Sequence, residues 1–343
     1  MSGNDRQRAC RAKLRNGASA LSLAVLVLAS AGPALAKGKI TSFDVPDSTN
    51  TFAKSIASDG SIVGYYEGAD GSDQGFLRAP DGAISTFNPK GSHGTMPAGI
   101  NGTGAIAGSY YDAHSNLHGF VRSAGGKIKR FDPAGSIETQ AQAIGDGGSI
   151  AGFYLDTSLV EHGFVRGADG SIVSFDPTGS TGTEANAINA NGDVTGYYAD
   201  SSGSVHGFLR TADGTIASFD VEGTTQTFPF GINAKDEIVG FYVNGGTVSG
   251  FVRSAAGTIT GFDPQGSFAT EAYAINDSGK ITGFYEDSTQ VRGFVGSPKT
   301  GFKSIDPPKS SDTEAFSIND EGAVAGFYSD KTGTHTHGFI RTP

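Results

Sequence analysis

Histidines that could ligate a metal recur at equivalent places in this chain of 343 residues. Each stands directly before a Gly-Phe pair: His118, His162, His206 and His337. A zinc site needs ligands that converge on bonds of roughly 2.0 Å, whereas equivalent positions of repeated units are dispersed. Other copies carry Gln74, Ser249 and Arg292 at this position. We therefore predict no metal site and assign the histidines a structural hydrogen bond to a neighbouring loop.

Aspartates that could bind calcium begin the connections that we expect to be longer loops. They follow a repeated tyrosine by two residues: Asp112, Asp156, Asp200, Asp287 and Asp330, with Asn244 in another copy. Such carboxylates can hold calcium, and they also form turns through their own backbone. No copy has the dense oxygen-ligand pattern of an EF-hand. The sequence favours turns and predicts no cofactor; calcium is the alternative, and Glu67, Asp70 and Asp73 are its best candidates.

Paired carboxylates for glycoside hydrolysis could come from Glu184, Glu271 and Glu314. Such a pair must lie roughly 5 to 10 Å apart, and nothing in the sequence places any two at that distance. The chain has no Gly-x-Ser-x-Gly elbow and no P-loop. No catalytic residue is predicted, and a carbohydrate-active hydrolase or lyase is the alternative to a binding function.

These residues are positioned by a unit of about 44 residues that occurs seven times. One series of the unit is Phe43, Phe87, Phe131, Phe175, Phe219, Phe262 and Ile305. Three more run in step with it, and in the first copy they are Ile56, Tyr66 and Phe76. Each copy offers four short β-type segments divided by turn residues, without helical periodicity. The predicted fold class is all-β, a seven-bladed β-propeller of four-stranded blades.

Paired turn residues predict how the third and fourth segments of a copy meet. Pairs such as Asp81-Gly82 and Asp169-Gly170 are typical of two-residue hairpins. With such a loop, Phe76 would face Phe87 across the hairpin, as would the equivalent pairs of later copies. The sixth copy has Lys299-Thr300-Gly301 instead, and we expect a bulged hairpin there.

The two ends of the repeat array predict a closed ring. The array starts with a lone fourth-type segment, residues 40–44, and ends just after a third-type segment that has no partner. The N-terminal outer strand should therefore pair with the C-terminal blade, with Phe339 against Phe43. A β-solenoid is the alternative, but it would need distinct terminal caps, and none is visible.

Loop length and variability together indicate a candidate binding face. The connections from second to third and from fourth to first segments look longer, and they share one side of the disc. Two inner-strand positions near that side differ between copies. The candidate ligand-binding residues are Phe52, Gln140, Glu184, Asn186, Phe228, Phe230, Glu271, Tyr273, Glu314 and Phe316. Lys54 and Gln142 occupy the same variable positions. Alternatively, these side chains only fill blade interfaces and the channel wall.

Residues 1–36 read as a secretory signal peptide, with a basic start, an apolar run and cleavage near Ala36. The single cysteine, Cys10, lies within it. Loss of its five basic and one acidic residues would take the formal net charge from −10 to −14, which argues against nucleic-acid binding. No later segment is long and apolar enough to span a membrane. We expect a secreted or periplasmic monomer whose domain spans residues 37–343.

The phrase Ala-Ile-Asn-x-x-Gly-x-x-x-Gly-x-Tyr, followed by His-Gly-Phe, resembles the bacterial extracellular HAF-type repeat, which has Ala where this chain has Gly119, Gly163, Gly207 and Gly338. The resemblance covers nearly all of the chain after the signal and implies secretion and a repeat architecture, without site residues to carry over. The sequence thus favours a non-catalytic binding module or interaction scaffold for an extracellular ligand, a glycan, peptide or protein. A structural surface or matrix protein is a further alternative.

Overall fold

The computed structural model describes residues 38–343, so the signal peptide predicted for residues 1–36 lies outside the described residues. The 28 strands of the described part form a ring of four-stranded antiparallel sheets, here called blades. Blade 1 is β2–β5, blade 2 is β6–β9, blade 3 is β10–β13, blade 4 is β14–β17, blade 5 is β18–β21, blade 6 is β22–β25, and blade 7 is β26–β28 with β1.

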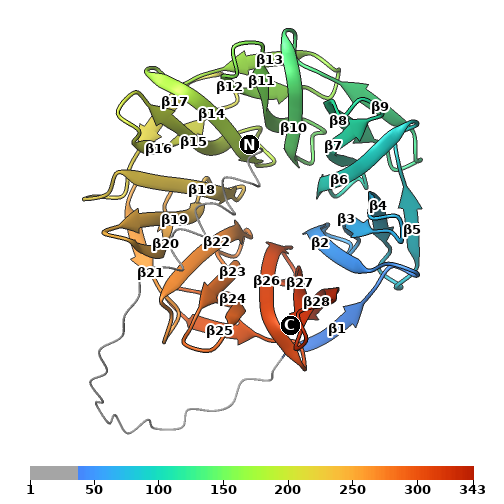
Figure 1. Cartoon of the computed structure of the whole chain (residues 1–343). Coiled ribbons are helices and arrows are strands. Elements are labelled where there is room, and N and C mark those ends of the chain that lie inside the picture. Colours follow the sequence, from blue (N-terminus) through green and yellow to red (C-terminus); the bar gives the residue numbers. More distant parts are fainter. Residues whose placement is uncertain (1–37) are drawn as a thin grey trace, which may run out of the picture. The chain divides into compact units, whose positions relative to one another are not determined.

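Four kinds of strand recur at increasing distance from the ring axis (Figure 1). The innermost, or first, strands are β2 (Asn50–Ile56), β6 (Ser92–Ile100), β10 (Ser136–Ile144), β14 (Ser180–Ile188), β18 (Gln226–Ile232), β22 (Ala269–Ile275) and β26 (Ser310–Ile318). The second strands are β3 (Ile62–Glu67), β7 (Ile106–Asp112), β11 (Ile150–Asp156), β15 (Val194–Asp200), β19 (Ile238–Asn244), β23 (Ile281–Glu286) and β27 (Val324–Asp330).

The outer half of each blade consists of a third and a fourth strand. The third strands are β4 (Asp73–Arg78), β8 (Leu117–Arg122), β12 (Glu161–Arg166), β16 (Val205–Arg210), β20 (Thr247–Arg253), β24 (Val291–Ser297) and β28 (Thr336–Thr342). The fourth strands are β5 (Ile84–Phe87), β9 (Ile128–Phe131), β13 (Ile172–Phe175), β17 (Ile216–Phe219), β21 (Ile259–Phe262), β25 (Gly301–Ile305) and β1 (Lys39–Phe43). The described residues include no helix that could cross a membrane.

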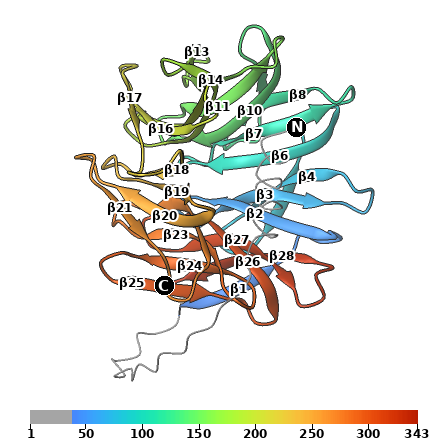
Figure 2. The same ribbon diagram turned by 60° about the vertical axis from the view of Figure 1, so that its left-hand side comes forward.

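The ring closes through the two ends of the described chain, as the sequence predicts. β1 pairs with β28 over five residue pairs, from Lys39 opposite Thr342 to Phe43 opposite Gly338. The outer strand of blade 7 therefore comes from the start of the described chain, and its other three strands come from the end (Figure 2). Pairing of this kind leaves no blade with an incomplete sheet.

The predicted aromatic pairs within hairpins are wrong by one residue. Phe87 lies opposite Gly75, and Phe76 lies opposite Thr86. The turn has three residues between Ala79 and Ala83, with the third in the left-handed region, so Asp-Gly forms the end of a longer loop. The same offset holds in all copies, and the sixth keeps this register despite its different turn. The predicted pair at the ring closure is wrong in the same way, because Phe339 lies opposite Ser42 and Phe43 lies opposite Gly338.

The aromatic contacts cross between blades instead. Each third-strand phenylalanine is fully buried: Phe76, Phe120, Phe164, Phe208, Phe251, Phe294 and Phe339. Six of them meet the outer-strand phenylalanine of the preceding blade, edge to face, at ring centroid distances of 5.7–6.2 Å. An arginine of the following blade covers five of those outer rings, as Arg78 does over Phe43 at 5.0 Å. These rings hold neighbouring blades together.

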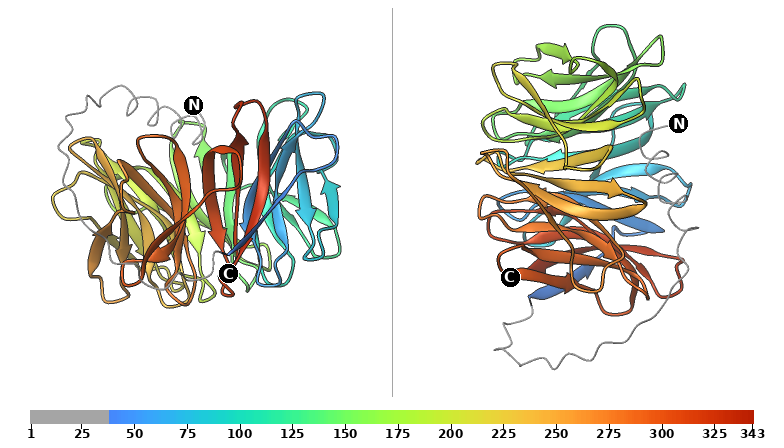
Figure 3. Two further views of the ribbon diagram at one scale, coloured as in Figure 1. Left: turned by 90° about the horizontal axis from the view of Figure 1, so that it is seen from below. Right: turned by 90° about the vertical axis from the view of Figure 1, so that its left-hand side faces the viewer.

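Loop length does not distinguish the two faces of the ring, contrary to the prediction. In blade 4 the successive connections span residues 189–193, 201–204 and 211–215. The strands continue into the segment expected to be loop, because Asp200 of β15 still pairs with Ser180 of β14. We call the side with the second-to-third connections the histidine face and the side with the first-to-second turns the asparagine face. Figure 3 shows the strands running between these faces.

Candidate functional site

Every first strand contains a β-bulge at the same place. In β14, Ala185 pairs with Gly196 and Ala187 with Thr195, so Asn186 is the extra residue between them. A bulge re-aims the side chain of its extra residue. The seven bulge residues are Lys54, Ala98, Gln142, Asn186, Phe230, Tyr273 and Phe316. They coincide with the second of the two positions that vary between copies.

The bulge residues surround a cavity of about 190 Å³ on the ring axis, here called the inner chamber. All seven line it, and each is followed by a small residue that also lines it: Ser55, Gly99, Ala143, Ala187, Gly231, Ala274 and Ser317. Small residues at that point leave room for the larger bulge side chains to define the cavity. The bulge residues differ in chemical type around the ring. They are aromatic on blades 5 to 7, carboxamides on blades 3 and 4, and a lysine with its ammonium group on blade 1.

The aromatic wall of the inner chamber belongs to a continuous series of rings. Tyr273 lies between Phe230 and Phe316, with centroid distances of 4.9 and 5.0 Å. The series runs from Tyr65 in blade 1 through blades 7, 6 and 5 to Tyr197 in blade 4. Its ten members are Tyr65, Phe52, Phe327, Phe316, Phe284, Tyr273, Phe230, Phe241, Phe228 and Tyr197. Among residues 38–343, the series has no member from blades 2 and 3, whose bulge residues are Ala98 and Gln142.

A second layer of variable residues, here called the upper layer, lies nearer the histidine face. Each member is paired with a second-strand residue, as Glu184 is with Tyr197. Glu184 is buried, and burial, followed by the charge and hydrogen bond of Glu184, raises the pKa of Tyr197 well above its usual value. Glu271 accepts a hydrogen bond of 2.8 Å from the Tyr273 hydroxyl. These two carboxylates are thus tied to the aromatic series.

The ten residues predicted as a ligand site divide between the two layers. Four line the inner chamber: Asn186, Phe230, Tyr273 and Phe316. Six lie in the upper layer, where Phe52 and Phe228 join the aromatic series, and Gln140, Glu184, Glu271 and Glu314 pair with second-strand aromatic residues. Lys54 and Gln142 line the chamber too, although the sequence did not place them among the ten.

A second cavity of about 200 Å³, the outer chamber, opens on the asparagine face. The isoleucines that end the first strands line it, and each is between 5 and 9% exposed: Ile56, Ile100, Ile144, Ile188, Ile232, Ile275 and Ile318. Four of them also line the inner chamber, so apolar side chains separate the two cavities. Asp146, Asp277 and Asp320 lie at its mouth.

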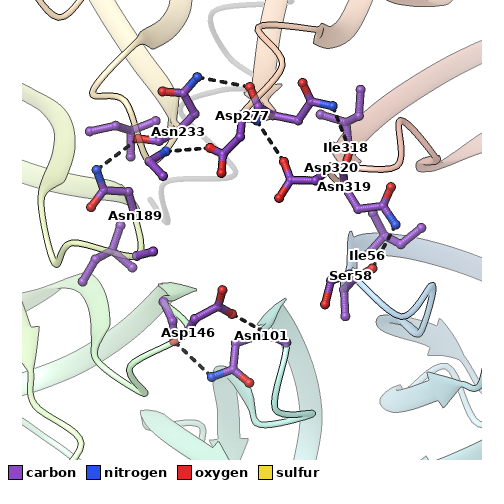
Figure 4. A pocket seen from close by; sticks show the side chains of 18 of the residues that line it. Ile56, Ser58, Asn101, Asp146, Asn189, Asn233, Asp277, Ile318, Asn319 and Asp320 are labelled. Carbon is purple, nitrogen blue, oxygen red and sulfur yellow. Dashed lines mark hydrogen bonds between the residues drawn. The ribbon is translucent and has the colours of Figure 1, made fainter.

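Buried asparagines link the blades around the outer chamber (Figure 4). The side-chain amide of Asn189 donates to the carbonyl of Asn233, and Asn233 donates in turn to Asn276, at 3.0 and 3.1 Å. Asn276, Asn319 and Asn101 make the same contact with the next blade. Sequence reasoning missed this set, whose signal was the Ile-Asn pair in five of the seven copies. The hydrogen bonds of these asparagines join neighbouring blades, so we assign the set a structural role.

The repeated histidines form hydrogen bonds near the outer edge of the histidine face, as predicted. His162 lies between Asp176 and Asp156, at 2.7 and 3.5 Å, and His118 and His206 are held in the same way. Burial opposes the charged form of His162, but the hydrogen bonds and charges of both aspartates outweigh it and raise its pKa. Within residues 38–343, no group of three or more His, Cys, Asp or Glu side chains has an arrangement that could hold a metal ion.

The residues considered for calcium are engaged in local contacts. Asp70 accepts hydrogen bonds from the backbone and hydroxyl of Ser72, which lowers its pKa, and Glu67 accepts one from Asn50. Burial and the charge of Glu67 raise the pKa of Asp73. Asp70 therefore acts as a turn former, in line with the interpretation that the sequence favoured.

Together, the ring of four-stranded sheets and the axial channel define a β-propeller. No family model and no curated protein matches the sequence. The structure is similar to virginiamycin B lyase from Staphylococcus aureus, with a TM-score of 0.60 at 13% identity over 89% of this chain and 99% of that one. It is also similar to the β-propeller domain of the Trilobed protease from Pyrococcus furiosus (0.62, 10%, 85% and 95%). A third neighbour is BP39L lectin from Burkholderia pseudomallei (0.53, 12%, 86% and 96%). These likenesses establish the fold alone.

Proposed function

We propose that the protein is an exported, non-catalytic binding module that holds a single-ring saccharide in the inner chamber. The observation that carries this proposal is the set of seven bulges. A repeated scaffold places one side chain per blade toward a common cavity, and those side chains differ in chemistry from blade to blade. Uniform positions build the ring, whereas a diversified ring of side chains is typical of recognition on a rigid scaffold.

The composition of the chamber favours a saccharide. The rings of Phe230 and Tyr273 can pack against the C–H face of a pyranose. The carboxamides of Gln142 and Asn186 offer both donors and acceptors to hydroxyl groups. This division into one aromatic and one polar side suits a ligand that is itself apolar on one face and hydroxylated at its edge.

The size of the chamber favours one ring. A cavity of roughly 150 Å³ holds a benzene-sized molecule, and the inner chamber has about 190 Å³. A monosaccharide, or the terminal unit of a chain that continues into the upper layer, fits this volume. One structural neighbour is named a lectin, which agrees with the proposal by analogy of fold.

Calorimetric titration of the purified protein with a panel of monosaccharides and short oligosaccharides tests the proposal. Phe230→Leu keeps an apolar side chain but removes a ring face, and it should weaken binding by about tenfold, as expected for one aromatic contact of about 1 to 1.5 kcal/mol. Phe268→Leu is the matched control, because Phe268 is 65% exposed and precedes β22 outside the chamber.

Three results would contradict the proposal. The first is an absence of binding to every sugar at millimolar concentration, and the second is equal weakening by both variants. The third is release of new reducing ends or unsaturated products from a bound oligosaccharide, which would favour the carbohydrate-active enzyme. Self-association on gel filtration without sugar binding would favour the structural surface protein.

A further inference from the structure

One residue that lines the inner chamber is charged. Among the described residues that line it, Lys54 is the only one with a charged side chain at neutral pH. The chain as a whole is acidic, with 35 acidic and 25 basic residues, and three aspartates line the outer chamber. The negative charges elsewhere along the channel disfavour an anionic ligand there. The Lys54 ammonium group therefore marks the place in the channel where an anionic group of a ligand is favoured.

Contacts with the aromatic wall hold the Lys54 side chain in place. Its Nζ atom lies 3.7 Å from the centroid of the Phe316 ring and 5.7 Å from that of Phe327. A cation over a ring face is attracted by the quadrupole of the ring, so the ammonium group stays beside the aromatic side of the chamber. A ligand ring that stacks on this side would have its substituents within reach of Lys54.

The wall next to Lys54 leaves space for a substituent. Blade 2 contributes only Ala98 and Gly99 and the end of the first strand at Ile100. Beyond it, the Gln142 and Asn186 carboxamides begin the polar side, and Asn186 is fixed by a hydrogen bond of 3.0 Å to the Pro229 carbonyl. The sector of blade 2 therefore lies between a cation and hydrogen-bonding groups, and its bulge residue is only an alanine.

The upper layer favours one orientation of a charged ligand. Its carboxylates, from Glu184, Glu271 and Glu314, lie on blades 4, 6 and 7. They can accept hydrogen bonds from hydroxyl groups, but they disfavour a ligand anion near the histidine face. A ligand with one acidic group would thus place that group deeper, in the layer of Lys54.

We propose that the ligand is a sugar acid, a pyranose that carries a carboxylate, and that Lys54 determines this specificity. The inference rests on the proposed function. The pyranose stacks on the aromatic wall, its carboxylate occupies the sector of blade 2 beside Lys54, and its hydroxyl groups meet Gln142 and Asn186. No covalent step is involved.

Calorimetry with matched acidic and neutral sugars tests the inference. D-Glucuronate and D-galacturonate should bind at least tenfold more tightly than D-glucose and D-galactose. Lys54→Met retains the unbranched stem but removes the ammonium group over the Phe316 ring, so it should remove this preference. Lys54→Arg should keep the preference, which shows that charge and not folding is responsible. Lys299→Met, an exposed lysine in the turn before β25, is the control and should change nothing.

The possible outcomes separate the inference from the proposed function. Equal affinity for acidic and neutral sugars, or a preference that survives Lys54→Met, overturns the inference and leaves a neutral-saccharide module. Absence of binding to all four sugars overturns both. Binding of benzoate with no binding of the uronates also overturns both, because the chamber would then recognise an aromatic acid and not a saccharide.

Discussion

Replacing Asn233 by alanine should destabilise the ring strongly, because this buried side chain forms four hydrogen bonds. Asn233 is 3% exposed. Its amide group donates to the Asn276 carbonyl at 3.1 Å and to the Glu237 carboxylate at 2.7 Å. Its Oδ1 accepts from the backbone amides of Lys235 and Glu237, both at 3.0 Å. The residue therefore stabilises its own turn and the contact with the next blade.

The expected loss follows from these bonds. Each contributes about 0.5 to 1.5 kcal/mol net, and a buried partner left without a bond adds to the cost. Water can replace the partners on the exposed side of the turn, whereas the Asn276 carbonyl is buried against its neighbour. We therefore expect Asn233→Ala to lower the free energy of unfolding by about 2 to 4 kcal/mol.

Urea denaturation, followed by tyrosine fluorescence because the chain has no tryptophan, measures this loss. Asn244→Ala is the matched control, since Asn244 is exposed at the end of β19, and it should change stability by less than about 0.5 kcal/mol. If both variants unfold at the same urea concentration as the unmodified protein, with unchanged slope, the asparagine links do not hold the blades together.

Three further predictions concern contacts between blades and within one blade. Ala57→Asn supplies the amide donor that blade 1 lacks toward the Asn101 carbonyl and should raise the free energy of unfolding by about 1 kcal/mol in thermal melts; an unchanged melting temperature would contradict this. The raised pKa of His162 stabilises the fold fully below about pH 6.5 and progressively less as pH rises through the folded value. His162→Gln should thus flatten the decline in urea midpoint between about pH 6 and pH 8, and an unaltered decline would refute the linkage. Phe43→Ala removes the outer-strand ring from Phe76 and should cost about 2 to 3 kcal/mol and speed proteolysis at β1; equal cleavage rates would show that closure does not depend on this ring.

The repeat spacing was sufficient to predict the strands, their order and the closure. Several series at the same period had to fit one unit, which restricts the possible pairings. The register of the outer hairpin was not determined in this way. Asp-Gly fits a two-residue loop and the end of a three-residue loop equally well, and one residue moves Phe87 from Phe76 to the next blade.

Only part of the candidate site could be predicted, again because a local change in strand geometry was not visible in the sequence. Variation between copies identified the two inner positions, but simple alternation places Phe52 and Lys54 on the same face. The bulge separates them into two layers, and no residue type that would predict a bulge recurs at this position in all the first strands. The asparagine links escaped prediction because their acceptors are backbone carbonyls about one repeat away, which carry no sequence signal.

The pairing of β1 with β28 has a consequence for how such rings change in size. The repeat begins with an outer strand and ends with a third strand, so gain or loss of whole units elsewhere would leave this clasp intact. Each added unit would bring its own Phe pair and its own bulge residue. Duplication of one unit could thus enlarge the ring and add a new side chain to the cavity in a single event, while the pairing of β1 with β28 is kept.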